Sequence, residues 1–410
     1  MNSEKYRTTR RTFLRTGTTG ACLGFFGPSL LASEFYRSRI AASTRTKNRE
    51  NYKIFSEGQI ANLALKNRMV RSAAFMGMSH RAYTEEAIAY YKALAEGGVG
   101  MIISGHMGVM KSDPSGVWYS STRINDDDCI SNISQMAKVV HKTNNKCKVI
   151  AQINNPGMQD IIKNPISPSD IYVGAMQDHG KEFHIPSTAE VEEIVSEFVD
   201  AGERVGKAGF DGVQLHAAHW YLLSTFLSPY ANKRTDKYGG SLENRVTIIR
   251  EIVEGIKERN GSDFPILIKM NADDFIEGGV DIDNFPSLAK EVAKTGLDAI
   301  EISSNNPIRP DLDDLEKQSY HLPYAEKLDL NIPLIITGGN KSVESLEGII
   351  QDKKADFLGF ARPLIREPNL PNRWLEGKGN DICDCISCNL CFSFLTQGEK
   401  AECHDIIKPD

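Results

Sequence analysis

The stretch GFDGVQLHAAHWY (209–221) joins a run of apolar residues to a group of polar rings. Its first half has the composition of a buried strand, and two histidines three residues apart and a tyrosine follow directly. In barrels of parallel strands and helices, catalytic groups lie at the carboxyl ends of the strands. The stretch therefore predicts a strand that ends in a functional site.

The same alternation of short apolar and longer amphipathic runs continues on both sides of this stretch. Helical patterns include 188–209, with a capping box of Ser187 and Glu190 at its start, and 242–261, which stops at Gly261. Eight runs have the character of buried strands, at 68–74, 100–104, 148–153, 211–216, 266–270, 298–303, 333–337 and 356–360. We therefore predict an α/β fold, a (β/α)8 TIM barrel. An open doubly wound sheet should show a G-x-G-x-x-G turn after its first strand, and none is found there.

The N-terminal part has the pattern of an export signal. TRRTFLR (9–15) precedes a modestly apolar stretch at 16–33, which is too short and too rich in Gly and Thr for a stable membrane span. The run RRTFL (10–14) is similar to the twin-arginine type, so we expect a periplasmic protein. We divide the chain into an export signal and linker (1–45), a barrel (46–375) and a short cysteine-rich C-terminal tail (376–410).

Two glycine-containing loops predict a phosphate site. TGGNKS (337–342) follows the seventh apolar run and GFARPL (359–364) contains the end of the eighth, and barrels often bind phosphate between the loops at these strands. Gly338 and Gly339 let backbone N–H groups approach an anion, and Arg362 offers a charge-assisted hydrogen bond.

Two polar residues interrupt apolar strands. Lys269 lies in ILIKM (266–270) and Gln152 in KVIAQI (148–153). A lysine in such a strand contacts an anionic ring, forms a Schiff base or is a paired structural residue. A side-chain amide hydrogen-bonds a heterocycle or satisfies a structural partner. The residues alone leave these alternatives open.

His216, His219 and Tyr221 allow three interpretations. As metal ligands the histidines need a third Asp, Glu, Cys or His, and HAAHWY (216–221) offers none. As core residues they need buried partners. As paired donors they hold one substrate oxygen and stabilise negative charge on it, while Tyr221 supplies a proton.

The segment that begins with these residues resembles the signature of a known family. Residues 216–245, HAAHWYLLSTFLSPYANKRTDKYGGSLENR, closely resemble H-x-x-H/N-G-Y-L-x-x-F-L-S-P-x-x-N-x-R-x-D-x-Y-G-G-S-x-x-N-R of the old yellow enzyme family of FMN-dependent ene-reductases. The resemblance covers about residues 52–375. It extends to LKNRMVRSAA (65–74), GGVGMIISG (97–105), AQINNPG (151–157) and DFLGFARPLIREP (356–368).

The resemblance implies a role for each matching residue. His216 and His219 would bind the carbonyl oxygen of an unsaturated substrate, and Tyr221 would protonate Cα after hydride passes from flavin N5 to Cβ. Lys269 would stabilise negative charge on the reduced flavin, which displaces the Schiff-base interpretation. The expected FMN contacts are Ala73, Ala74, Phe75, His106, Gln152, Lys269, Gly338, Gly339, Ala361 and Arg362.

Four positions depart from the family pattern. Phe75 stands where many members have a Thr or Cys that tunes the flavin potential, and Asn155 and Met158 replace a common His and Arg. Trp220 replaces the usual Gly between the second histidine and Tyr221. We expect this indole to narrow the substrate space or to shift the tyrosine.

Five of the eight cysteines lie in the tail. The pattern Cys385-x2-Cys388-x2-Cys391-x11-Cys403 resembles the iron–sulfur segment of the larger family members, 2,4-dienoyl-CoA reductase and trimethylamine dehydrogenase. Those enzymes have one more residue between the second and third cysteines. The resemblance implies a [4Fe-4S] cluster, with Cys383 as an alternative ligand. A structural zinc site or, in an oxidising compartment, disulfides remain open alternatives.

These observations favour an exported FMN-dependent ene-reductase. The alternatives are a Schiff-base barrel lyase that uses Lys269 and an exported flavin electron carrier, but neither needs HAAHWY (216–221). The formal net charge of −6 argues against a general nucleic-acid-binding protein.

The expected partners follow from this assignment. We expect a small unsaturated carbonyl compound as the acceptor, and NAD(P)H or an exported redox protein as the electron donor. The larger family members continue into a nucleotide-binding module, whereas this sequence ends at Asp410, so electrons that pass through a cluster should come from elsewhere. A homo-oligomer is compatible with the sequence.

Overall fold

The computed structural model describes residues 48–404, except residue 80 and the segments 112–121, 159–164, 174–181, 306–317 and 396–397. The predicted export signal and linker (1–45) lie outside these residues. Within the described residues, no helix combines the length and the hydropathy that crossing a membrane requires.

In the described residues, eight parallel strands form a closed barrel. Around the ring they are β3 (Met69–Arg71), β4 (Met101–Ile103), β7 (Lys148–Asn154), β8 (Gly212–Ala217), β9 (Ile266–Asn271), β10 (Ala299–Ser303), β11 (Leu334–Thr337) and β12 (Phe357–Phe360). Pairing of β12 with β3 closes the ring. Each of the eight predicted runs overlaps one of these strands, and no strand extends more than one residue beyond its run, so the predicted (β/α)8 barrel is confirmed.

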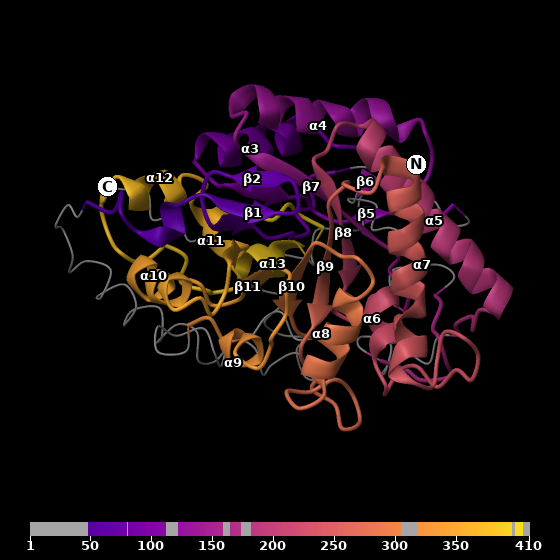
Figure 1. The fold of residues 1–410 in the computed structure, drawn as a ribbon. Helices are drawn as coiled ribbons and strands as arrows, with labels where there is room; N and C mark the ends of the chain where they lie inside the picture. The colour runs from indigo at the N-terminus through magenta and orange to yellow at the C-terminus, as the bar shows by residue number, and fades with distance from the viewer. Residues whose placement is uncertain are drawn as a thin grey trace, which may run out of the picture. The chain divides into compact units, whose positions relative to one another are not determined.

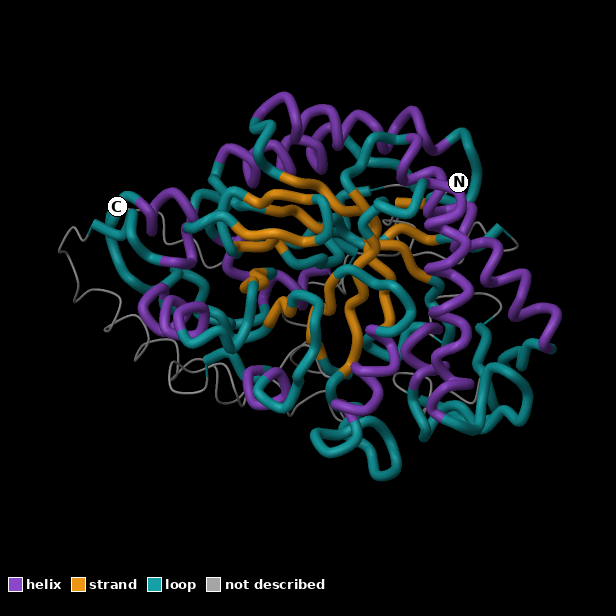
Figure 2. Tube along the Cα trace, in the orientation of Figure 1, coloured by secondary structure: helices purple, strands orange, loops and turns teal. Residues whose placement is uncertain are grey.

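Helices surround the strands. Figures 1 and 2 show α3, α4, α5, α7 and α8 outside the central strands. The larger helices are α3 (Glu85–Glu96), α4 (Cys129–Thr143), α5 (Thr188–Lys207), α7 (Leu242–Asn260), α8 (Phe285–Ala293) and α10 (Val343–Gln351). The predicted capping box starts α5: the Ser187 side chain accepts from the Glu190 N–H, and the Glu190 carboxylate accepts from the Ser187 N–H. Helix α7 ends at Gly261, whose φ of 98° favours glycine.

The alternation of side chains along each strand separates the core from the site. In β8, Val213 and Leu215 belong to the main core cluster of the barrel, whereas Gln214 and His216 are on the other face. Near the starts of the strands, inward residues such as Leu267 form a second apolar cluster. The hairpin of β1 (Gly58–Ile60) and β2 (Leu63–Leu65), which the sequence analysis did not predict, contributes to this cluster. Apolar residues therefore fill the amino-terminal end of the barrel and polar residues collect at the carboxyl end.

Short elements complete the described chain. They are η2 (Lys53–Phe55), β5 (Met107–Gly108), β6 (Thr122–Arg123), α6 (Leu222–Leu227), α9 (Leu322–Ala325), α11 (Arg362–Arg366), α12 (Leu370–Leu375) and α13 (Leu390–Leu395). The tail packs onto loops of the barrel, since the Cys383 N–H donates to Lys341 O and the Ala401 N–H to Met76 O, both at 2.8 Å. The described part of the tail thus helps to build the carboxyl end of the barrel.

Candidate active site

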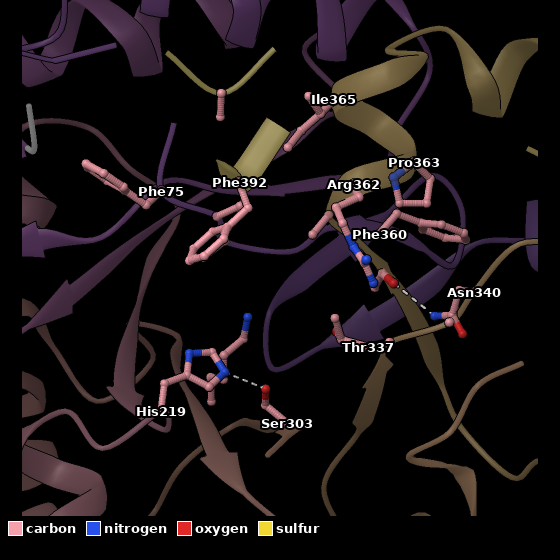
Figure 3. A pocket seen from close by; sticks show the side chains of 18 of the residues that line it. Phe75, His219, Ser303, Thr337, Asn340, Phe360, Arg362, Pro363, Ile365 and Phe392 are labelled. Carbon is pink, nitrogen blue, oxygen red and sulfur yellow. Dashed lines mark hydrogen bonds between the residues drawn. The ribbon is translucent and has the colours of Figure 1, made fainter. Parts of the chain in front are cut away.

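A cavity of about 400 Å³ lies at the carboxyl ends of the barrel strands. This volume is in the range of small-molecule sites. All thirteen residues predicted for catalysis or cofactor contact line it: Ala73, Ala74, Phe75, His106, Gln152, His216, His219, Tyr221, Lys269, Gly338, Gly339, Ala361 and Arg362. Figure 3 shows His219 beside Ser303 on one side of the cavity, and Arg362 and Phe392 on another.

A buried polar network connects Lys269, Gln152 and Thr337, which line this cavity, to Glu301 and Gln214. Lys269 Nζ lies 3.1 Å from Glu301 Oε1, and both side chains are almost fully buried. Glu301 also accepts hydrogen bonds from Gln214 at 2.7 Å and Thr337 at 2.6 Å, and Gln152 donates to Gln214 at 2.8 Å. Burial alone would raise the pKa of Glu301, but the Lys269 charge and these hydrogen bonds outweigh it and hold the pKa below its usual range. The buried carboxylate of Glu301 engages the Lys269 amine, whereas a Schiff-base lysine needs a free amine to attack a carbonyl.

The three residues predicted for catalysis form one cluster. The His216 ring centroid lies 5.1 Å from that of His219 and 4.4 Å from that of Tyr221. His216 is an inward residue of β8, and His219 follows in the loop, where its Nε2 lies 2.7 Å from Ser303 Oγ. Their convergence places two imidazoles and a phenol against the same space.

Burial sets the protonation of this cluster. It lowers the pKa of His216 and of His219 well below the usual value, and the nearby Lys269 charge acts in the same direction. It raises the pKa of Tyr221 to about 12. At neutral pH the imidazoles are therefore neutral hydrogen-bond donors, and the phenol holds its proton.

An unusual backbone turn carries His219 into place. His219 and Trp220 have φ values of 63° and 59°, in the left-handed region that glycine favours. The His219 N–H donates to Asn271 Oδ1 at 3.1 Å and the Trp220 N–H to Asn305 Oδ1 at 2.9 Å. The amides of both asparagines donate to Asp274 Oδ1, at 3.1 and 2.7 Å. Asp274 therefore orients the two amides that hold the turn.

The side chain of Trp220 lies elsewhere than expected. It packs against a separate apolar cluster that contains Met158 and Val173, and it is not among the residues that line the cavity. Among the described residues, the indole therefore does not narrow the cavity, and whether it affects the substrate space or Tyr221 stays a prediction. Because Trp220 has a left-handed φ that glycine adopts without strain, the backbone explains why the family pattern has Gly at this position.

The other end of the cavity has features of an anion site. Gly338 and Gly339 have φ values of 110° and 71°, and a Cβ at Gly338 would lie 2.6 Å from the Tyr320 ring. Only glycine therefore fits at this strand end without a shift, and its backbone stays accessible to a ligand. Arg362 lines the same end and donates to Asn389 of the tail.

The four cysteines proposed as cluster ligands also lie together. Cys385, Cys388, Cys391 and Cys403 line a second, small cavity of about 20 Å³. Arg362 and Cys391 line both this cavity and the larger one. The seven described cysteines are free thiols, and no group of three or more His, Cys, Asp or Glu side chains in the described residues is arranged as a metal site.

The fold and the cavity define a TIM-barrel protein with a small-molecule site at the carboxyl face of its strands. Residues 53–380 match the NADH:flavin oxidoreductase / NADH oxidase family, so the chain belongs to this family of oxidoreductases. The match ends before the tail cysteines.

Individual relatives agree with this family. The chain is 35% identical over 350 residues to an NADH oxidase of Thermoanaerobacter brockii, in an alignment that covers 82% of the chain and 53% of the relative. The chain thus spans about half the length of that protein. It is 33% identical to an NADPH dehydrogenase of Halalkalibacterium halodurans, covering 78% of the chain and 93% of the relative. An old yellow enzyme homologue from Zymomonas mobilis has the same fold, with a TM-score of 0.65 at 22% identity over 82% of the chain and 96% of that protein.

Several residues of the site escaped the sequence analysis. Glu301 gives the same signal as Lys269, a charged residue in an apolar strand, and the two are register partners in β10 and β9. Lys341 is buried and lines the cavity within the quoted TGGNKS loop. Asn271, Asn305 and Asp274 carry no distinctive pattern, because ordinary polar residues follow most strands.

Proposed function

We propose that the protein is an FMN-dependent oxidoreductase of the ene-reductase type, which reduces a C=C bond activated by a carbonyl or related group. The observation that carries the proposal is the convergence of His216, His219 and Tyr221 on the cavity that Gln152 and Lys269 also line. The family supports flavin chemistry at this site.

The residues that line the cavity fit FMN. Gln152 offers an amide to a heterocycle, and Lys269 places a buried positive charge where a reduced flavin would be negative. Gly338, Gly339 and Arg362 would hold the phosphate. FMN, when bound, supplies the hydride that reduces Cβ of the acceptor.

The protein's own groups act on the acceptor. Neutral His216 and His219 would each donate a hydrogen bond to its oxygen and stabilise the negative charge that develops there. Polarisation of the oxygen withdraws electron density from Cβ, which favours hydride addition. Tyr221 holds a proton that it would deliver to Cα.

We extend the proposal to the tail and to the location of the protein. Cys385, Cys388, Cys391 and Cys403 would hold a [4Fe-4S] cluster; the resemblance of their spacing to the iron–sulfur segment of larger family members and their position around one small cavity support this. The N-terminal twin-arginine pattern supports export to the periplasm. NAD(P)H or an exported redox protein would then supply electrons. Rapid reduction by NADH or NADPH, together with equal reduction of wild type and Cys385→Ser by periplasmic cytochromes, would contradict the exported-donor route.

Anaerobic purification, followed by an assay in which an unsaturated carbonyl compound reoxidises the reduced protein, tests the function. We expect a protein with visible flavin absorption whose reduced form is reoxidised by the acceptor. Tyr221→Phe should slow formation of the saturated product by about 10²- to 10⁴-fold, the usual contribution of a positioned acid. His184→Gln, at an exposed histidine paired with Glu190, is the matched control and should have no effect. Purification without flavin, or reduced protein that no activated C=C reoxidises, would refute the proposal.

A further inference from the structure

A third histidine contacts the proposed proton donor. His106 follows β4 and is 6% exposed, and its Nε2 lies 3.4 Å from the Tyr221 hydroxyl. The two ring centroids are 5.4 Å apart. This is the one hydrogen bond of the Tyr221 hydroxyl within the described part of the chain.

The contact matters because a phenol that gives its proton to a substrate must point that proton into the cavity. Its oxygen is then free to accept a hydrogen bond, and it becomes a phenolate once the proton has left. A donor on Nε2 of His106 would stabilise the phenolate, whereas a lone pair there would repel it. The tautomer of His106 therefore decides the effect.

Asn154 controls this tautomer. Its side-chain amide is fully buried, with the oxygen position 3.1 Å from His106 Nδ1 and with Nδ2 lacking a partner among the described residues. The two ends of an asparagine amide have nearly the same shape, so the hydrogen-bond network decides which atom faces the ring. If the Asn154 amide is turned over, its Nδ2–H, which otherwise has no partner, donates to His106 Nδ1. The side-chain oxygen of Asn154 is then left without a donor, which a buried carbonyl tolerates better than a buried N–H tolerates the lack of an acceptor. His106 then accepts at Nδ1 and carries its proton on Nε2.

We propose that His106, held by Asn154 as the Nε2–H tautomer, is a positioning residue that donates a hydrogen bond to the Tyr221 oxygen. When Tyr221 protonates the acceptor, its O–H bond breaks, the new C–H bond forms and the electron pair stays on the phenolate oxygen. His106 keeps its own proton and stabilises that oxygen. The proposal rests on the proposed function, and it gives His106 a role toward Tyr221 in addition to the predicted cofactor contact.

Burial supports the neutral form that this role requires. It lowers the pKa of His106 to about 4. His106 is thus a neutral donor at neutral pH. Its ring stacks on Phe75 at 5.6 Å and faces His216 at 6.2 Å, so it has little freedom to turn away.

Nitrogen NMR of histidine-labelled protein tests the tautomer without any turnover. His106→Gln identifies the His106 signals by their loss. We expect a protonated Nε2 and an unprotonated Nδ1 in the wild type, and a changed tautomer signal in Asn154→Leu, which removes the amide donor. A wild-type His106 protonated on Nδ1 would overturn the proposal.

A nitroalkene acceptor tests the effect on proton transfer. Hydride addition to it leaves a nitronate, which absorbs in the ultraviolet until it is protonated on carbon, so flavin reoxidation and protonation are measured separately. We expect His106→Ala to lower the ratio of nitronate protonation to flavin reoxidation by roughly 10- to 100-fold, the effect of a hydrogen bond to a charged group. His106→Gln, whose amide retains a donor, should recover part of this loss, and His184→Gln should match the wild type.

The outcomes separate this proposal from the proposed function. If His106→Ala leaves the ratio unchanged, His106 does not assist Tyr221 and the proposal is overturned. If the nitroalkene and other activated alkenes fail to reoxidise the reduced wild type, the proposed function fails. The NMR result then still decides the tautomer of His106.

Discussion

The buried pair of Lys269 and Glu301 offers the most quantitative prediction. Their side chains are 4% and 0% exposed, so Lys269→Met leaves a carboxylate in the barrel without its counter-charge. Removing one partner of such a pair typically costs about 3–5 kcal/mol. We expect this loss at pH 7 in denaturant unfolding of the flavin-free forms, because bound FMN would add its own difference in affinity for the two proteins to the result. Lys269→Met/Glu301→Gln should recover most of it, because no buried charge remains.

The pH dependence of stability gives a second, independent test of the same ion pair. In the wild type the pKa of Glu301 is lowered, so its contribution to stability is present above the unfolded pKa and is lost as the pH falls through the folded pKa. In Lys269→Met, burial is no longer offset by the lysine charge, and the pKa of Glu301 rises. The deficit of this variant should therefore shrink by up to about 1.4 kcal/mol per unit as the pH falls from 7 toward 5. A single variant as stable as the wild type at pH 7, or a deficit that stays constant with pH, would refute the reasoning.

Three further changes have expected outcomes. The Asp274 carboxylate accepts hydrogen bonds from Asn305 and three other groups, and Asp274→Asn replaces one of its acceptor oxygens with an NH2 donor. This change should lower the free energy of unfolding by about 1–3 kcal/mol in denaturant. An unchanged free energy of unfolding would mean that Asp274 does not hold the turn. Trp220→Gly relieves the strain of a left-handed backbone conformation and removes an indole that packs outside the cavity. The range of acceptors reduced in steady-state assays should therefore not change, and a broader range would contradict this prediction. Ser187→Ala removes the cap of α5 and should lower stability by about 1 kcal/mol in thermal or denaturant unfolding, and an unchanged stability would show that this cap does not hold the helix start.

Much of the fold was predictable because its signals are local. Each barrel strand is a short apolar run, and the Ser187 capping box marks the start of α5 within a single turn. The β1–β2 hairpin escaped prediction because three-residue strands with ordinary residues leave no clear periodicity. Its place depends on apolar residues from distant strands.

The site divides in the same way. Lys269 and Gln152 stand out as polar residues in apolar strands, and HAAHWY (216–221) follows a strand end, so the sequence alone selects them. His106 follows β4 and Asn154 ends β7, so their contact joins residues 48 positions apart, and no local sequence pattern predicts it. The position of the Trp220 indole likewise depends on the turn that surrounding asparagines hold.

The central claim is that His216 and His219 hold an oxygen of the acceptor beside bound FMN. Titration of the oxidised, flavin-loaded protein with a simple phenol tests it most directly, because a phenolate bound by both imidazoles places its ring against the flavin. We predict a long-wavelength charge-transfer band in the wild type, and binding weakened by roughly tenfold or more in His216→Ala/His219→Ala. A flavin spectrum that the phenol leaves unchanged, or equal binding by the double variant, would contradict the claim.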